Sequence, residues 1–300
     1  MDKNFKIWGM SYGLIGDLIM GLPMLTYFEK KYPGSYKYWV IEKKCSVCAP
    51  LYFNHPLIDR IKITDEWSGF GEEDKRLMAS ADVKTTCEGW KHDRPDWYNV
   101  RSCVEETAIV AGISDFLEIL KEEISPQLNK WFNVGFFNPK CHTYTKQYTS
   151  SNEGFKNNIA IWPFATAGDK TGRSPSLGWW KKVVETLISL GYTVYHYGMP
   201  TEPKITTIEG YCNFTFLSYF EQVQGALASK LTIGTDSGSM WVMGAYAHPA
   251  INLMTMWLKN HKTNHLALAP VNLNATNLFK EGGCDNITID EILTIVKKKI

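Results

Sequence analysis

The residues whose types and spacing are best suited to chemistry lie between positions 231 and 249. Residues 231–234 are apolar or small and predict a short buried strand, which leads through Asp236, Ser237 and Gly238 into an apolar segment that predicts a helix. Such a turn brings unpaired backbone N–H groups and the positive end of the helix dipole to one point. That point can bind an anion such as phosphate. The alternative is that Asp236 or Ser237 only caps the helix.

A second turn of the same kind is expected near the start of the chain. Residues 5–8 predict a first strand, and residues 9–17 (G-M-S-Y-G-L-I-G-D) a glycine-rich turn. Residues 18–31 predict a helix with an early irregularity at Pro23. Asp17 stands beside this turn, as Asp236 stands beside the other. If the two turns face each other, they form a cleft with a carboxylate on one wall and a phosphate site on the other.

The elements that must position these turns alternate between strand and helix. This alternation predicts parallel sheets with helices on both faces, in which ligands bind beyond the carboxyl ends of the strands. Capping boxes predict helices that begin after Ser218 and after Thr288. Further strands are expected at 38–41, 60–63, 81–84, 192–197 and 250–254, and further helices at 45–51, 72–80, 102–111 and 180–190.

The composition limits the class of protein. With 300 residues, the chain is long enough for two domains of ordinary size. Its 32 basic and 31 acidic residues leave a net charge of +1, so no electrostatic attraction to nucleic acid is expected. Seven scattered cysteines, an odd number, argue against a disulfide framework and for the reducing cytoplasm. No signal peptide is expected, because residues 1–4 lead directly into the first strand. No membrane span is expected either, because Gly244, His248 and Pro249 interrupt the uncharged run 237–258.

The two segments that carry the aspartates resemble a known family. G-L-I-G-D-L-I-M-G-L-P (13–23) and T-D-S-G-S-M-W-V-M-G-A-Y-A-H-P (235–249) are similar to motifs of glycosyltransferase family 9, the ADP-heptose:lipopolysaccharide heptosyltransferases and their relatives. Segments 159–166, 197–202 and 277–288 resemble the strand and loop that open the family's C-terminal domain, its next strand end and its closing segment.

This resemblance, which covers most of the chain except residues 65–150, implies an α/β protein with the GT-B fold. That fold consists of two facing Rossmann-like domains with parallel sheets and a cleft between them. We expect an acceptor-side domain at residues 1–152 and a nucleotide-sugar-binding domain at residues 153–300. The last helix is expected to pack on the second domain or back on the first.

The family's activity gives an expected function. A related protein would transfer heptose or a similar sugar, with inversion, from a nucleotide-diphosphate sugar to a glycan or lipid-linked glycan. Neither a metal nor a cofactor is expected, and no nucleic-acid partner. The resemblance implies a role in lipopolysaccharide biosynthesis in the cytoplasm, and a lipid-linked acceptor would allow a peripheral contact with the inner face of the membrane.

The resemblance also implies roles on the acceptor side. Asp17 would be the general base that takes the proton of the acceptor hydroxyl. On the residues alone, the favoured interpretation of Asp17 is a first-turn aspartate that the helix dipole stabilises. Ser11, Gly13 and Gly16 would form the acceptor-side loop around it.

On the donor side, backbone N–H groups at Ser237 and Gly238 would bind the diphosphate. Glu202 would accept hydrogen bonds from the ribose hydroxyls, and the alternative is that Glu202 is only an exposed loop residue. Asp236 would bind the donor or hold the turn. Either Lys170 or Arg173 would neutralise the charge of the leaving group without a metal. The expected donor-binding residues are Thr166, Lys170, Arg173, Glu202, Asp236, Ser237 and Gly238.

One departure from the family pattern leaves alternatives open. Trp241 stands where the family usually has a histidine, and an indole cannot carry a proton or a charge in its place. The difference is compatible with another donor sugar, with another contact to the diphosphate or with weakened activity. It is also compatible with a scaffold protein that binds nucleotide-sugars without turnover.

A serine hydrolase is a further alternative. Residues 9–13 match G-x-S-x-G, and Ser11, Asp236 and His248 follow the order of a Ser…Asp…His triad. A nicotinamide dehydrogenase is disfavoured, because Ser11 interrupts the G-x-G-x-x-G pattern that such an enzyme requires.

Overall fold

The chain divides into two compact units, Met1–Cys141 and His142–Ile300. The computed structural model describes residues 5–13, 15–43, 46, 52, 55–64, 70–88, 103–120, 157–165, 173–246, 248–255 and 274–300. Both this division and the expected domain boundary at 152/153 fall in the stretch 121–156, which lies outside the described residues.

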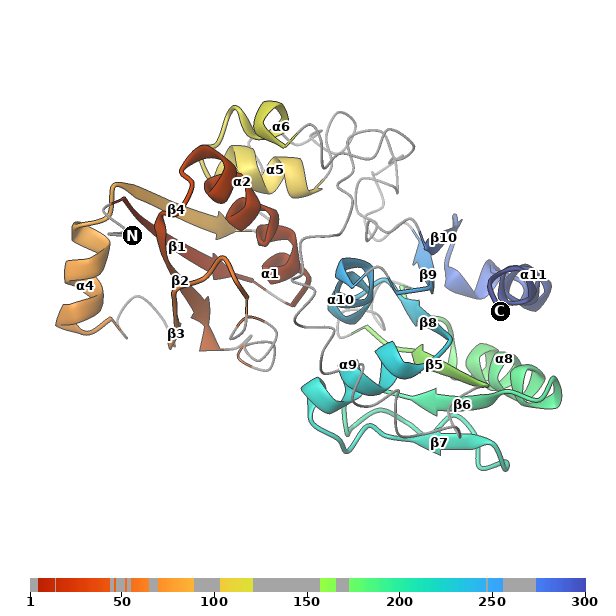
Figure 1. Cartoon of the computed structure of the whole chain (residues 1–300). Coiled ribbons are helices and arrows are strands. Elements are labelled where there is room, and N and C mark those ends of the chain that lie inside the picture. Colours follow the sequence, from red (N-terminus) through yellow and green to blue (C-terminus); the bar gives the residue numbers. More distant parts are fainter. Residues whose placement is uncertain are drawn as a thin grey trace. The chain divides into compact units, whose positions relative to one another are not determined.

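The described part of the first unit is built on a four-stranded parallel sheet with strand order β3-β2-β1-β4 (Figure 1). Side chains alternate between its faces because successive residues of a strand point to opposite sides. Trp8, Met10, Tyr38 and Val40 form a cluster with Phe70 on the face that is covered by the helix after β3. The strands are β1 (Lys6–Tyr12), β2 (Tyr36–Glu42), β3 (Arg60–Thr64) and β4 (Val83–Glu88).

Five helices accompany this sheet within the described residues: α1 (Ile15–Gly21), α2 (Pro23–Lys31), α4 (Glu72–Ala79), α5 (Cys103–Val110) and α6 (Phe116–Ile119). Helix α4 covers the face with the Trp8 cluster, and α1 contacts β1, β4 and α5 on the other side (Figure 1). The helix expected over residues 18–31, with an irregularity at Pro23, is found with an earlier start, and the irregularity at Pro23 is confirmed. It begins at Ile15 and is divided at Leu22, because Pro23 lacks the N–H that would continue the first helix.

The expected glycine-rich turn over residues 9–17 is also shorter than predicted. Strand β1 continues through Gly9 and Ser11 to Tyr12, and the turn begins at Gly13. Gly9 is required for packing: a Cβ atom there would overlap the ring of Trp39 on the neighbouring strand. A glycine that permits close packing looks the same in a sequence as a glycine that permits a turn.

The described part of the second unit contains a six-stranded parallel sheet with strand order β10-β9-β8-β5-β6-β7. The central strands β5, β8 and β9 are buried along their whole length. Such continuous burial is typical of a parallel sheet with helices on both faces. The strands are β5 (Asn158–Trp162), β6 (Thr193–His196), β7 (Tyr211–Asn213), β8 (Leu231–Thr235), β9 (Ala250–Thr255) and β10 (Ala275–Lys280).

The helices of this unit form one layer on each face of the sheet. Helices α9 (Tyr219–Ala228) and α10 (Gly238–Ala245) lie on one face, and α8 (Leu177–Ser189) and α11 (Ile289–Lys299) lie on the other, after the short 3-10 helix η8 (Cys284–Asn286) (Figure 1). Ile292 and Val296 place α11 in the core of the second unit. The capping boxes expected at Ser218 and Thr288 open α9 and α11.

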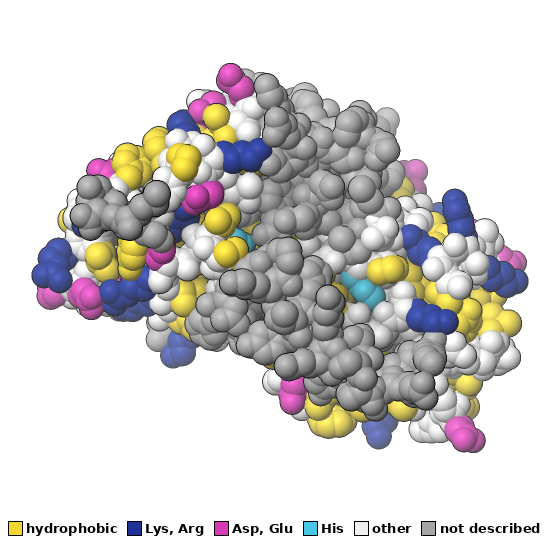
Figure 2. Space-filling view, viewed as in Figure 1, with side chains coloured by type: hydrophobic (Ala, Val, Ile, Leu, Met, Phe, Trp, Pro, Cys, Tyr) yellow, Lys and Arg dark blue, Asp and Glu magenta, His cyan; other side chains and the backbone are white. Residues whose placement is uncertain are grey.

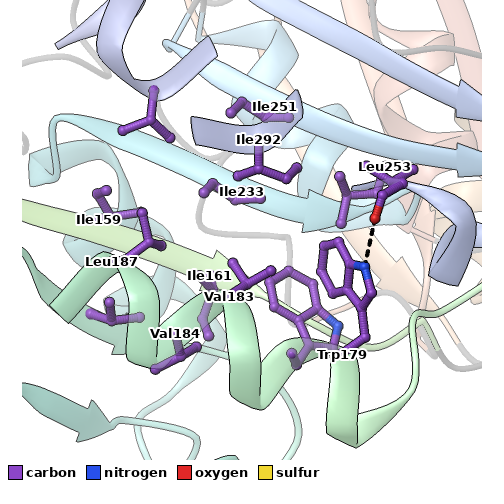
Figure 3. Packing of buried hydrophobic residues seen from close by; sticks show 14 of the residues in the cluster. Ile159, Ile161, Trp179, Val183, Val184, Leu187, Ile233, Ile251, Leu253 and Ile292 are labelled. Carbon is purple, nitrogen blue, oxygen red and sulfur yellow. Dashed lines mark hydrogen bonds between the residues drawn. The ribbon is translucent and has the colours of Figure 1, made fainter. Parts of the chain in front are cut away.

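The core beneath α8 and α11 is shown in Figure 3. Alternate residues of the strands, such as Ile159, Ile233 and Ile251, form one cluster with the apolar faces of α8 and α11, and Ile251 lies beside Ile292 of α11. Trp179 adds a polar connection, because its Nε1 donates to the carbonyl oxygen of Ile287 at 2.7 Å (dashed in Figure 3). This bond ties the start of α8 to the segment that precedes α11.

Strands β7 and β10 were not expected from the sequence. They are the two edge strands of the six-stranded sheet, and their residues are only half-buried. The remaining predicted strands and helices that fall on described residues are found, with ends that move by a few residues. The helix expected at 45–51 lies largely outside the described residues.

None of the helices in the described part of the chain is long and apolar enough to cross a membrane. On the face in Figure 2, the Lys and Arg side chains of described residues are scattered, and several of them stand next to Asp or Glu side chains.

Gly234 tests whether close packing positions the end of β8. A Cβ atom at Gly234 would overlap Met240 Sδ and lie 3.1 Å from the carbonyl oxygen of Trp162. Gly234→Ala is therefore expected to lower the free energy of unfolding by roughly 1–3 kcal/mol, the usual cost of overpacking. The matched control is Gly178→Ala in α8, where a Cβ atom meets nothing within 4 Å and should stabilise by roughly 0.5–1 kcal/mol. Urea unfolding that shows equal stability for the two variants would contradict this account.

Candidate functional site

The candidate anion site is at the carboxyl end of β8, where the chain turns into α10. Ser237 is the N-cap of α10 and has an extended backbone, but its side chain makes no capping hydrogen bond. Its Oγ atom is buried and has no hydrogen-bond partner among the described residues. Since a helix N-terminus also presents unpaired N–H groups, this turn collects donors that have no acceptor in the described structure.

A buried ion pair lies directly beside this turn. Arg173 Nη2 donates to Asp236 Oδ2 at 2.8 Å and to the Asp236 carbonyl oxygen at 3.2 Å. The side chains of Arg173 and Asp236 are 19% and 9% exposed. The backbone of Arg173 is fixed as well, since Cys284 Sγ donates a hydrogen bond to the Arg173 carbonyl oxygen at 2.9 Å. The pair therefore joins the segment after β5, the end of β8 and the start of η8.

The protonation states at this pair follow from burial and charge. Burial raises the pKa of the Asp236 carboxyl, and the Arg173 guanidinium opposes that rise. Burial also raises the pKa of the Cys284 thiol to about 12, so the thiol keeps its proton and can act as a donor. Asp236 thus depends on Arg173 to remain ionised.

Glu202 lies in the loop that follows β6. Its Oε1 accepts a hydrogen bond from the Met199 backbone N–H at 2.9 Å, and its Oε2 lies 3.1 Å from Nε2 of the fully buried His196. The carboxylate rests directly on Gly198, where a Cβ atom would overlap it. The loop is thus shaped around this carboxylate, and the Glu202 side chain remains 12% exposed.

Gln222, on the first turns of α9, holds two of the loops at this edge together. Its Oε1 accepts from the Gly198 N–H at 2.8 Å, and its Nε2 donates to the carbonyl oxygens of Gly198 at 3.0 Å and of Leu217 at 2.8 Å. One buried amide therefore ties the loop after β6 to the loop after β7.

Aromatic side chains fill the space between these loops on the α9 side of the sheet. The rings of Tyr197 and Tyr219 lie 5.6 and 5.8 Å from the ring of Trp162 at the end of β5. Tyr219 Oη also donates to Ser239 Oγ at 3.4 Å. Within the described residues, the buried Trp162 Nε1 has no hydrogen-bond partner, like Ser237 Oγ.

In the first unit, Asp17 lies in the first turn of α1 and is 2% exposed. Gly13 has a φ of +116°, and a Cβ atom there would overlap the Asp17 carboxylate. Glycine at position 13 therefore serves both the turn and the close approach of the carboxylate. Gly16, the other expected loop glycine, is part of α1.

Ser11 does not belong to a loop. It lies in β1, is 1% exposed, and its Oγ accepts a hydrogen bond from Trp39 Nε1 at 3.0 Å. A nucleophile elbow requires an exposed serine on a strand-to-helix turn. The Ser11 hydrolase alternative does not fit this position.

The structure brings together part of the expected donor site. Arg173, Asp236 and Ser237 are adjacent, and Gly238 is the first residue of α10. Thr166 and Lys170 lie outside the described residues. Four further residues make hydrogen bonds at this site that the sequence pattern did not predict: His196, Tyr211, Gln222 and Cys284.

Two other expectations concern α10 and metals. Trp241 lies on α10 with an exposed fraction of 9%, and its backbone N–H donates to the Ser237 carbonyl oxygen at 3.2 Å. Over the part of the chain that the structure describes, no group of three or more His, Cys, Asp or Glu side chains is arranged to hold a metal ion.

The ion pair can be tested by a double-mutant cycle. Arg173→Met leaves Asp236 buried without its cation and is expected to cost roughly 3–5 kcal/mol of stability, whereas Arg173→Met with Asp236→Asn should cost much less than the sum of the single changes. Urea unfolding of the four proteins measures the coupling. Additive effects would show that the two side chains do not depend on each other.

The same variant gives a pH dependence. Without Arg173, burial alone acts on Asp236, so its folded-state pKa lies further above the unfolded value. The folded state then binds the proton more tightly, and the stability of Arg173→Met should rise relative to wild type as the pH falls through that raised pKa. Asp236→Asn is the control, since it cannot titrate at this position.

Comparisons with known proteins give a match at the level of structure. No family model matches the sequence, and no curated protein matches it. The solved structure of Escherichia coli ADP-heptose lipopolysaccharide heptosyltransferase II is similar with a TM-score of 0.69 at 16% identity, over 98% of both chains. A family 9 glycosyltransferase from Veillonella parvula is similar with a TM-score of 0.66 at 16% identity, over 98% of this chain and 96% of that one.

A third similar structure is the E. coli heptosyltransferase WaaC with ADP, with a TM-score of 0.67 at 12% identity, over 99% of this chain and all of the other. At such low identities, the matches establish the fold. The expected fold class is confirmed: the chain has two α/β domains with parallel sheets and the GT-B fold of the solved family 9 heptosyltransferases.

Proposed function

We propose that this protein is an inverting glycosyltransferase that moves a sugar from a nucleotide-diphosphate sugar to a hydroxyl of a glycan or lipid-linked glycan. The observation that carries the proposal is the buried Ser237 hydroxyl, which lacks a partner within the described residues at the N-terminus of α10 beside Arg173. A buried polar group without a partner is costly, so its retention favours a ligand that supplies the acceptor.

The donor would lie along the carboxyl edge of the second sheet. Ser237, the N–H groups of the first turn of α10 and Arg173 would bind the diphosphate, and Glu202 would bind the ribose. Strand β5 lies between β8 and β6, so the two loops are separated by two strand spacings, roughly 10 Å. One nucleoside diphosphate can extend over such a distance.

Asp17 would act as the base in the reaction. Its carboxylate takes the proton of the acceptor hydroxyl, and the acceptor oxygen forms a bond to the anomeric carbon. The bond from that carbon to the diphosphate oxygen breaks on the opposite side, and the electron pair leaves with the nucleoside diphosphate. Arg173 and the α10 N-terminus would stabilise the charge that develops there, so the proposal requires no metal.

Two of the similar solved structures support the choice of substrate class. WaaC was solved with ADP and with ADP-2-deoxy-2-fluoro heptose. We take heptose or a related sugar as the donor group, lipopolysaccharide biosynthesis in the cytoplasm as the setting, and the inner membrane face as the place where a lipid-linked acceptor would be met. Trp241 is the residue through which the sugar or diphosphate contact would differ from the family.

A second candidate function is binding of a nucleotide-sugar without transfer. It is favoured by the burial of Asp17, which is 2% exposed, whereas a base must reach the acceptor hydroxyl. The two functions differ in turnover and agree in donor binding, so the experiments below separate them.

The first test concerns donor binding. Ser237→Ala removes a hydroxyl that has no partner in the described structure, so the free protein should be as stable as wild type or slightly more stable. Its affinity for ADP or another nucleoside diphosphate should fall by about 3- to 10-fold, as expected for one lost hydrogen bond. Calorimetric titration measures the affinity.

The control for this test is Thr232→Val. Thr232 is the second residue of β8, away from its carboxyl end, and its Oγ1 is likewise buried without a partner among the described residues. The change leaves the carboxyl edge untouched and should not alter nucleotide affinity. Equal affinities for wild type, Ser237→Ala and Thr232→Val would remove Ser237 from the donor site.

The second test concerns the base. Asp17→Asn keeps the size of the side chain but removes its ability to take a proton, so turnover should fall by roughly two to four decades while donor affinity changes little. Release of nucleoside diphosphate from a panel of nucleotide-sugars is measured with and without a glycolipid acceptor extract. Asp115→Asn, at a partly exposed carboxylate paired with Lys31 in the same unit, is the control. Wild-type binding without turnover would favour the second function, and an active Asp17→Asn would exclude Asp17 as the base.

A further inference from the structure

A chain of hydrogen bonds runs behind Glu202 on the α8 face of the second sheet. The Ile205 backbone N–H donates to Tyr211 Oη at 3.2 Å, Tyr211 Oη lies 2.7 Å from His196 Nδ1, and His196 Nε2 lies 3.1 Å from Glu202 Oε2. His196 is the last residue of β6 and Tyr211 is the first of β7. The chain thus crosses from one strand to its neighbour and ends on the carboxylate.

The direction of these hydrogen bonds follows from the groups themselves. An ionised carboxylate only accepts, so His196 Nε2 must carry the proton that it shares with Glu202. In the neutral ring, Nδ1 is then an acceptor, and Tyr211 must donate to it. Burial raises the pKa of Tyr211, which keeps the phenol protonated. Tyr211 thereby selects the tautomer of His196 that donates to Glu202.

The carboxylate keeps acceptor capacity after these contacts. Each carboxylate oxygen can accept about two hydrogen bonds. Glu202 Oε1 receives one from Met199, and Oε2 receives one from His196. One acceptor position therefore remains on each oxygen, on a side chain that is 12% exposed. Two acceptors side by side, held on a rigid support, match a pair of neighbouring hydroxyl groups.

We propose that His196 and Tyr211 are positioning residues that hold the Glu202 carboxylate so that both of its oxygens accept from the 2′- and 3′-hydroxyls of a ribonucleotide. The proposal rests on the proposed function, since it assumes that the ligand is a nucleoside diphosphate. It goes beyond that function by assigning selection of ribose over deoxyribose to the buried His196 and the half-buried Tyr211, neither of which would touch the ligand.

The physical reason for such a support is orientation. A glutamate has three flexible side-chain bonds, and a free carboxylate would lose that freedom when the ligand binds. The Met199 N–H, the His196 ring and the Gly198 backbone fix it before binding, which lowers that cost. A ligand that lacks one hydroxyl then leaves an oriented acceptor without its donor.

The experiment measures the ratio of two dissociation constants, for the 2′-deoxy and the ordinary form of the same nucleoside diphosphate. The probe is whichever of ADP, GDP, UDP and CDP raises the unfolding midpoint most, together with its 2′-deoxy and 3′-deoxy forms. Calorimetry is applied to the full chain as wild type, Glu202→Gln, Tyr211→Phe, His196→Gln and His196→Leu. The wild-type ratio should be about 10- to 100-fold, as expected for a hydrogen bond to a charged group.

The variants separate positioning from general structure. Tyr211→Phe frees His196 to take the other tautomer and should lower the ratio by about 3- to 10-fold, and His196→Leu should bring it to the level of Glu202→Gln. His196→Gln should retain much of the ratio, because its amide nitrogen can replace Nε2 as a donor to Glu202. Tyr195→Phe is the matched control, because it removes a phenol from the same strand on the opposite face and should leave the ratio unchanged.

Each outcome decides a different point. If the wild type prefers the ribonucleotide and Tyr211→Phe keeps the full ratio, the positioning role is overturned while the proposed function stands. A fall in affinity for all three forms with a constant ratio would indicate a merely structural role and would also overturn it. If no nucleoside diphosphate binds the wild type, the proposed function fails, and this inference fails with it.

Discussion

The buried ion pair between Arg173 and Asp236 is the interaction on which the second unit's carboxyl edge depends. Neither charge can be buried alone, so each side chain requires the other. The backbone reinforces this constraint: the Asp236 N–H donates to the Leu253 carbonyl oxygen at 2.9 Å, and Cys284 donates to the carbonyl oxygen of Arg173. Four segments that are far apart in the chain therefore meet at one point, which fixes the turn that presents Ser237.

Most of the fold could be predicted from local patterns, because hydrophobic periodicity and capping residues act within a few positions. The Ser218 and Thr288 capping boxes are examples, and so is the strand expected at 231–234 and found at Leu231–Thr235. The secondary-structure predictions were wrong where a residue's type is determined by its contact with a residue that is distant in sequence. Gly9 suggested a turn, but a glycine is needed there because the ring of Trp39 packs against it. The edge strand 211–213 is only half-buried, so its residues show little hydrophobic pattern.

The candidate site divides in the same way. Asp236 and Ser237 could be identified because strand, turn and helix are contiguous there, and the resemblance to family 9 pointed to Asp17 and Glu202. The pairing of Arg173 with Asp236 spans 63 positions, and the partner of Glu202 is a histidine that reads as an ordinary strand residue. Burial decides such pairings, because a charge removed from water must find a partner wherever the fold supplies one.

Gln222 has a consequence for how this edge can change. Because one amide bonds to backbone groups on both the loop after β6 and the loop after β7, neither loop can alter its path without leaving a buried donor or acceptor unmet. The two loops are therefore exchangeable only as a single module that includes the start of α9. A chimera that receives one loop alone would lose hydrogen bonds between the Gln222 amide and the backbone of that loop, however well the new side chains suit a ligand.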